Sequence, residues 1–188
     1  MRVAFAVAHR FTLALAALLL LAAGAFADDA LDKAQLDQLF AQLRAAPDAA
    51  TAHQIDQQIW MIWTNPSDKD LAQKMLGVVA LQSVGDVPGA LELLGTIVTD
   101  YPTYAEGWNR RATLYYMIND FEASLADIDK VLEFEPRHFG ALSGRVLIYL
   151  AQGKRSEALR DMATALAIHP FLNERQLFPE LKEDMVRI

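Results

Sequence analysis

The chain has 188 residues, 53% of them hydrophobic, and its 17 Lys+Arg against 24 Asp+Glu give a formal net charge of −7. This length fits one domain or a small repeat array, and the apolar fraction excludes an intrinsically disordered chain. The negative charge argues against nucleic-acid binding, and the absence of cysteine excludes disulfides, cysteine-ligated zinc and thiolate nucleophiles.

Residues 1–27 have the pattern of a secretory signal peptide. Two arginines and no acidic residue occur in the first ten positions, residues 11–27 are uncharged, and Ala25 and Ala27 form a small-x-small ending. We therefore expect export to the periplasm, with no stable membrane insertion after cleavage. The alternative is an uncleaved segment, residues 11–27, that anchors the protein in the membrane with its remaining part facing the periplasm.

The segment 28–66 is predicted to form a pair of helices. Apolar residues recur at helical spacing over 31–46 and again over 52–63. We interpret the pair as a degenerate repeat that caps the N-terminal end of the domain. Trp60 and Trp63 lie on one face of the second helix, where they are expected to pack within the cap; the alternative is that they form an exposed aromatic contact for a partner.

A repeat of 34 residues follows this segment. Pro102, Pro136 and Pro170 are each 34 residues apart, and a proline at this position ends the second helix of a unit. The three units are 71–104, 105–138 and 139–172.

Other columns align on the same period. Position 15 of the unit holds Gly85, Asn119 and Gly153, residue types that tolerate a positive φ and let the chain reverse after a helix. Position 20 is small, and positions 24 and 27 are apolar in all three copies, as the buried seam between two helices requires. Each unit is therefore a helix–turn–helix, and the units stack into a solenoid.

The repeat resembles the tetratricopeptide repeat, most clearly over 105–136, where Trp108, Tyr115 and Pro136 stand at the family's positions. Tyr149 holds the same column as Tyr115 in the third copy, and these aromatic residues are expected in the core. The resemblance implies an all-α fold, a right-handed α-solenoid of three tetratricopeptide repeats. The degenerate helix pair would precede them, and a C-terminal capping helix over 173–188 would follow.

Position 7 departs from the family's usual leucine. It is Arg111 in the second copy and Arg145 in the third, and sixteen residues later stand Asp127 and Asp161. We predict that each arginine pairs with the aspartate of its own repeat. The alternative is that the arginines bind a ligand's carboxylate.

The resemblance also implies a concave groove lined by the first helices of the units. Family geometry assigns eleven binding candidates to it, most of them small or apolar, and this lining suits a peptide with apolar side chains. The candidates are Met75, Val79, Gln82, Glu106, Asn109, Arg110, Thr113, Tyr116, Met117, Ser143 and Leu147.

The sequence contains no motif for a nucleophile, a metal or a phosphate, so we expect no catalytic residues, no metal and no cofactor. The favoured interpretation is a periplasmic adaptor or scaffold that binds a protein or peptide in cell-envelope assembly or homeostasis. One alternative is a fixed subunit of a larger envelope complex, of the secretion or cytochrome-maturation type. A second is an enzyme that uses Glu106, Arg110 and Tyr116.

Overall fold

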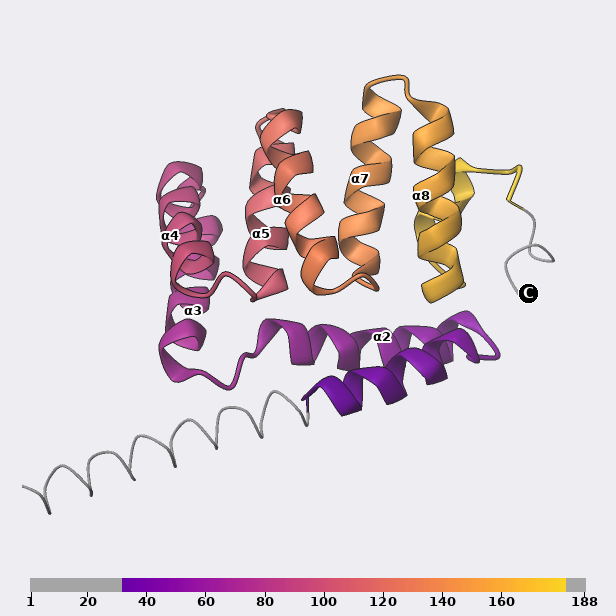
Figure 1. Ribbon diagram of the computed structural model, residues 1–188, viewed down its shortest axis with the longest axis horizontal. Coiled ribbons are helices and arrows are strands. Elements are labelled where there is room, and N and C mark those ends of the chain that lie inside the picture. The colour runs from indigo at the N-terminus through magenta and orange to yellow at the C-terminus, as the bar shows by residue number, and fades with distance from the viewer. Residues whose placement is uncertain (1–31, 182–188) are drawn as a thin grey trace, which may run out of the picture. The chain divides into compact units, whose positions relative to one another are not determined.

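Helices make up every regular element of residues 32–181, the part of the chain that the computed structural model describes (Figure 1). The predicted signal peptide lies outside these residues. The chain divides into two compact units between residues 38 and 39. The described part of the first, residues 32–38, begins a helix that continues to residue 44, and Lys33 pairs with Asp37 across one turn at 3.8 Å.

The second unit contains three successive helix pairs, in which neighbouring helices pack against one another. The chain is thus an all-α solenoid. The first helix of each pair starts within two residues of a predicted repeat boundary. The pairs are α3 Lys69–Ser83 with α4 Val87–Asp100, α5 Ala105–Met117 with α6 Phe121–Phe134, and α7 Phe139–Ala151 with α8 Arg155–Ile168.

The turn inside each pair has the same conformation. Gly85, Asn119 and Gly153 have φ of 75°, 61° and 71°, which confirms the predicted left-handed residue at position 15. The next residue caps the second helix in two of the three pairs. Asp86 accepts a hydrogen bond from the amide of Gly89, and Asp120 accepts one from that of Ala123.

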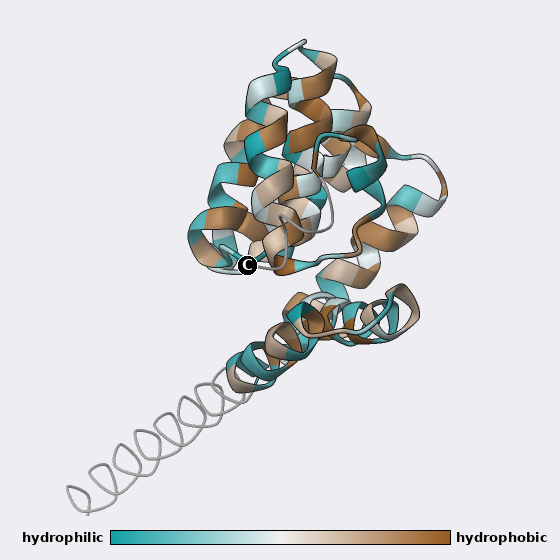
Figure 2. Cartoon of the chain, turned by 90° about the vertical axis from the view of Figure 1, so that its right-hand side faces the viewer, coloured by the Kyte–Doolittle hydropathy of each residue, from teal (hydrophilic) through white to brown (hydrophobic). Residues whose placement is uncertain are grey.

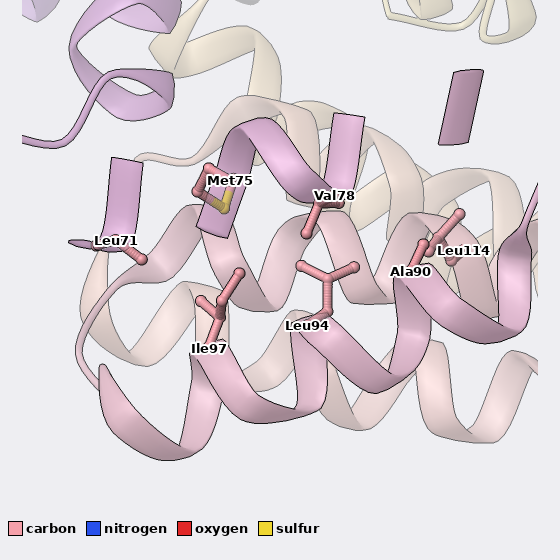
Figure 3. Packing of buried hydrophobic residues seen from close by; sticks show 7 residues of the cluster. All are labelled: Leu71, Met75, Val78, Ala90, Leu94, Ile97 and Leu114. Carbon is pink, nitrogen blue, oxygen red and sulfur yellow. The ribbon is translucent and has the colours of Figure 1, made fainter. Parts of the chain in front are cut away.

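The core lies along the predicted seam of each pair. In the first pair, Leu71, Met75 and Val78 of α3 point toward Leu94 and Ile97 of α4 (Figure 3), and all five side chains are buried. Figure 2 shows hydrophobic and hydrophilic residues alternating along the helices, because only one face of each helix meets its neighbours.

Three aromatic residues predicted to lie in the core are only half-buried. Trp108, Tyr115 and Tyr149 lie at the edge of the helix seam, where a ring face meets a cation. The Arg111 guanidinium lies 5.0 Å from the Trp108 ring centre and 5.8 Å from that of Tyr115. Lys154 lies 5.9 Å from the Tyr149 ring centre. These rings therefore cover cations at the edge of the seam, whereas the sequence predicted that they would fill its centre.

The helix pair expected in segment 28–66 is present, as the helix over 32–44 and as α2, Ala49–Thr64. α2 begins at Asp48, which accepts a hydrogen bond from the amide of Thr51 at 2.8 Å. α2 packs on α5 and, through its tryptophans, on the start of α7 (Figure 1). It therefore crosses two repeats of the array.

The C-terminal end differs from the expected amphipathic helix over 173–188. The structure has a short 3-10 helix there, Asn173–Leu177, followed by a turn. Phe178 is fully buried among the core residues of α7 and α8, and the Arg155 guanidinium lies 5.1 Å from its ring centre. One buried aromatic ring thus covers this end of the core where a helical face was expected. Residues 182–188 lie outside the described part.

Candidate binding cavity

A cavity of about 570 Å³ lies among α2, α5, α6, α7 and the segment after α8. Its volume is in the range of ligand-binding pockets. The first helices of the second and third pairs supply one side of it, and α2 supplies another.

Five of the eleven predicted groove residues line this cavity. Asn109, Thr113 and Tyr116 come from α5, and Ser143 and Leu147 come from α7. They share this surface because positions 5, 9 and 12 of the repeat follow one another on one helical face. The second and third pairs thus form the hollow part of the groove.

The other six candidates lie elsewhere. Met75 is 4% exposed and belongs to the core between α3 and α4, so its assignment to the groove is corrected. Its unbranched, flexible side chain fills the space between the two helices. The remaining five do not line the cavity. They are Val79, Gln82, Glu106, Arg110 and Met117.

Glu106, expected as a polar group of the groove, is 3% exposed. Its carboxylate accepts hydrogen bonds from Asn109 Nδ2 at 2.8 Å and from Arg110 Nε at 3.0 Å. His138 Nδ1 accepts a hydrogen bond from the amide of Ala141, so a ring proton is on Nε2. This atom lies 3.4 Å from Glu106 Oε2. Glu106 therefore orients groups at the junction of two repeats and does not face the cavity.

An aromatic cluster holds α2 against the array. Trp63 stacks on His138, with ring centres 4.1 Å apart and planes within 6°. Trp60 meets Phe139 edge to face at 5.7 Å, and the hydroxyl of Tyr104 donates a hydrogen bond to the carbonyl oxygen of Trp63 at 2.8 Å. These contacts fix the wall of the cavity that α2 provides.

The two predicted arginine–aspartate pairs are confirmed. Arg111 donates two hydrogen bonds to Asp127, at 2.7 and 2.8 Å. Arg145 donates two to Asp161, at 2.7 and 3.0 Å. Both guanidinium groups are thus engaged within their own repeats, which disfavours their use as a clamp for a ligand's carboxylate. The sequence did not indicate a third partner, Asp129 of α6, which accepts from Arg145 at 2.9 Å.

His169 lines the cavity from the end of α8 and is 5% exposed. Its Nδ1 accepts a hydrogen bond from the amide of Phe171 at 3.3 Å, and its ring meets Phe139 edge to face. Burial is the main cause that lowers the pKa of His169 to about 4, with a smaller contribution from the nearby His53 and against the opposing effect of a backbone hydrogen bond. The ring is therefore neutral at pH 7.

This lowered pKa predicts a pH-dependent stability. The unfolded chain binds a proton at His169 near pH 6.5, whereas the folded chain does so only near pH 4. The stabilisation is complete above pH 6.5 and is lost as the pH falls toward 4. We expect a loss of about 1–2 kcal/mol in the free energy of unfolding between pH 7 and pH 4.5. This is less than the total that about 1.4 kcal/mol for each pH unit between the two pKa values would give without screening, because solvent at the cavity screens the charge.

Urea unfolding across this pH range measures the effect. His169→Asn keeps an acceptor near the position of Nδ1 and removes the titration, so the variant's stability should fall less with pH than that of the wild type. Equal losses in the two proteins would assign the pH dependence to other groups.

The cavity shows no arrangement for metal chemistry. Within residues 32–181, no three His, Cys, Asp or Glu side chains gather closely enough to hold a metal ion. Its described lining is mainly apolar and aromatic, with isolated polar groups. Such a surface is suited to binding a ligand.

Two known proteins that resemble this chain in sequence are named for tetratricopeptide repeats. A TPR repeat-containing protein of Rhizobium etli is 36% identical over 138 residues, which cover 73% of this chain and 68% of that protein. Tetratricopeptide repeat protein 34 of Mus musculus is 35% identical over 60 residues, 32% of this chain and 11% of that protein. The crystal structure of MamA aligns with a TM-score of 0.49 and 17% identity, covering 74% of this chain and 79% of that one. No family model matches the chain.

The stacked helix pairs and their concave cavity define an α-solenoid repeat protein, a class that binds its partners along the concave surface. The chain belongs to the tetratricopeptide repeat family. Proteins of this family are in general interaction modules, so the chain is a scaffold for protein–protein interaction.

Proposed function

We propose that this protein is an exported adaptor of the cell envelope, which binds a peptide or a segment of a partner protein in the cavity. The observation that carries the proposal is the cavity itself, with five groove residues of α5 and α7 in its walls. Its volume of about 570 Å³ is large enough for a few side chains of a bound segment.

The polarity of the lining supports a peptide ligand. Tyr116 and Leu147 offer apolar surface, while Asn109 and Thr113 offer polar groups close to it. A peptide carries both kinds of group along its length, so it can bury apolar side chains and hydrogen-bond its backbone in the same site.

Export to the periplasm is part of the proposal and rests on the pattern of residues 1–27. Within residues 32–181, no helix combines the length and the hydropathy needed to cross a membrane. Fusing residues 1–27 to alkaline phosphatase, which is active only after export, tests this part. An inactive fusion that stays in the cytoplasm would overturn it.

Photo-crosslinking in the source cells tests the binding site. A photoreactive amino acid at Thr113 or Leu147 places the probe in the cavity, and the same residue at Thr96 of α4, which is exposed and outside the cavity, is the control. We expect a discrete adduct from the cavity positions only. Equal adducts from Thr96, or adducts from Thr96 alone, would contradict the proposal, and a stable stoichiometric complex on purification would favour a fixed subunit.

A further inference from the structure

The Asp, Glu, Lys and Arg side chains that line the cavity are all acidic. Asp56 of α2 and Glu174 of the segment after α8 line it, and no lysine or arginine of the described residues does. His169, also in the wall, is neutral at pH 7 because burial lowers its pKa to about 4. The electrostatic potential inside the cavity is therefore negative, which favours a cationic ligand.

Asp56 is half-buried, and one oxygen of its carboxylate has no hydrogen-bond partner in the described part of the chain. Its Oδ1 is buried and accepts no hydrogen bond from the residues that the structure describes. The closest basic group is the exposed His53 ring, whose Nδ1 lies 3.9 Å from Oδ2. Burial raises the pKa of Asp56, against smaller opposing effects of His53 and Trp60. A buried carboxylate oxygen without a partner costs stability, so a cation bound to it would relieve that cost.

A second unpartnered group lies on α7. Ser143 is 7% exposed, lines the cavity, and its Oγ has no hydrogen-bond partner among residues 32–181. Most buried hydroxyl groups in proteins are hydrogen-bonded. A hydroxyl oxygen can accept a hydrogen bond from an ammonium or guanidinium group, beside the stronger, charge-assisted bond that a carboxylate accepts.

The remaining walls suit the stem of such a group. Trp60, Tyr116, Phe139 and Leu147 line the cavity with aromatic and aliphatic surface. The methylene stem of a lysine or an arginine packs on apolar surface while its charged end reaches a polar group.

From these four observations we propose that the cavity recognises a basic side chain, lysine or arginine, of the bound peptide, and that its charged end pairs with Asp56 and hydrogen-bonds to Ser143. This inference rests on the proposed function, since it presumes that the cavity binds a peptide. It adds a specificity: the preferred segment carries a positive charge beside apolar residues.

Peptide pools test the specificity. We would immobilise the purified full chain and measure retention of acetylated, amidated eight-residue pools with a fixed central Lys, Arg, norleucine or Glu and random flanking residues. The Lys and Arg pools are expected to be retained about tenfold better than the norleucine pool, one such factor being worth 1.4 kcal/mol. The Glu pool should be retained least.

Two variants assign this preference to the named groups. Asp56→Asn should bring the ratio of Lys to norleucine retention close to one, and Ser143→Ala should lower it severalfold. Glu92→Gln removes the same charge from an exposed position of α4 outside the cavity, so it should leave the ratio unchanged. Equal retention of the Lys and norleucine pools by the wild type, or an unchanged ratio in Asp56→Asn, would overturn the inference.

Folding of the variants is checked by circular dichroism. Asp56→Asn removes a half-buried charge whose burial raises its pKa and keeps an amide oxygen that can accept from Trp60, so it should unfold at a temperature no lower than the wild type at pH 7. Ser143→Ala removes a hydroxyl with no partner to lose, and it carries the test if Asp56→Asn does not fold.

A third variant separates this inference from the proposed function. Thr113→Trp fills the cavity from its exposed side. If Thr113→Trp abolishes retention of every pool but the wild type shows no charge preference, the peptide site stands and the basic specificity is wrong. If no pool binds the wild type better than it binds Thr113→Trp, the peptide-binding function fails as well.

Discussion

Asp127→Ala is expected to lower the free energy of unfolding by about 3 kcal/mol or more, because it leaves a partly buried guanidinium without its carboxylate. Asp127 is 4% exposed and accepts hydrogen bonds from Arg111 Nε and Nη2 at 2.7 and 2.8 Å. The hydrogen bond with Asp127 also raises the pKa of Arg111. Arginine stays protonated even without its partner, so the variant has to hold an unpaired charge between α5 and α6.

The other pair supplies a matched comparison. After Asp161→Ala, Arg145 keeps its hydrogen bond to Asp129 at 2.9 Å, so the loss should be smaller. Replacing Arg111 and Asp127 together by leucine should bring stability back to within about 1 kcal/mol of the wild type, as neutral replacement of buried pairs does elsewhere. Urea unfolding measures all three. A double variant as unstable as Asp127→Ala would show that the loss of side-chain packing, and not the unpaired charge, causes the lower stability.

Gly140→Ala should displace α2 from the array. A Cβ at Gly140 would lie 2.8 Å from Cη2 and 2.9 Å from Cζ2 of Trp60, closer than side chains approach without moving. We expect a net loss of about 1 kcal/mol or more, since overpacking outweighs the gain of about 1 kcal/mol that alanine brings over glycine inside a helix. Peptide retention should fall too, because Trp60 forms part of the cavity wall.

Gly144→Ala is the control for this effect, one turn further along α7. A Cβ there would meet only Ile128 Cδ1, at an ordinary 3.8 Å, so the variant should gain about 0.5–1 kcal/mol from helix propensity. Urea unfolding gives the stabilities, and amide hydrogen exchange of α2 reports its docking. If both variants behave alike, or if exchange in α2 of Gly140→Ala stays at the wild-type rate, the contact with Trp60 does not hold α2.

Features that depend on one repeat could be predicted from the sequence. The left-handed residues at Gly85, Asn119 and Gly153 and the pairing of Arg111 with Asp127 are set by neighbours within 34 positions. When the three repeats are aligned on their 34-residue period, such residues fall at the same position in each repeat. The fold and half of the groove surface followed from this local geometry.

Features that depend on contacts between distant segments could not be predicted. Nothing in the sequence of α2 indicates that Trp60 and Trp63 meet Phe139 and His138. A single acidic residue in an amphipathic helix normally lies in solvent, so Asp56 carried no signal of a binding group. Gly140 could have indicated the contact with α2, because a glycine inside a predicted helix often marks a close approach of another segment.

The position of α2 has a consequence for folding of the chain. In the repeats, every helix packs on the helix before it in the sequence, so folding can proceed from one pair to the next. The tryptophans of α2 are different, since their partners His138 and Phe139 lie two repeats further along the chain. Docking of α2 therefore closes an early segment onto a late one, and such long-range closure slows folding. Until it occurs, the tryptophan surface that meets His138 and Phe139 is uncovered, and a chaperone that holds the unfolded chain would have its binding surface there.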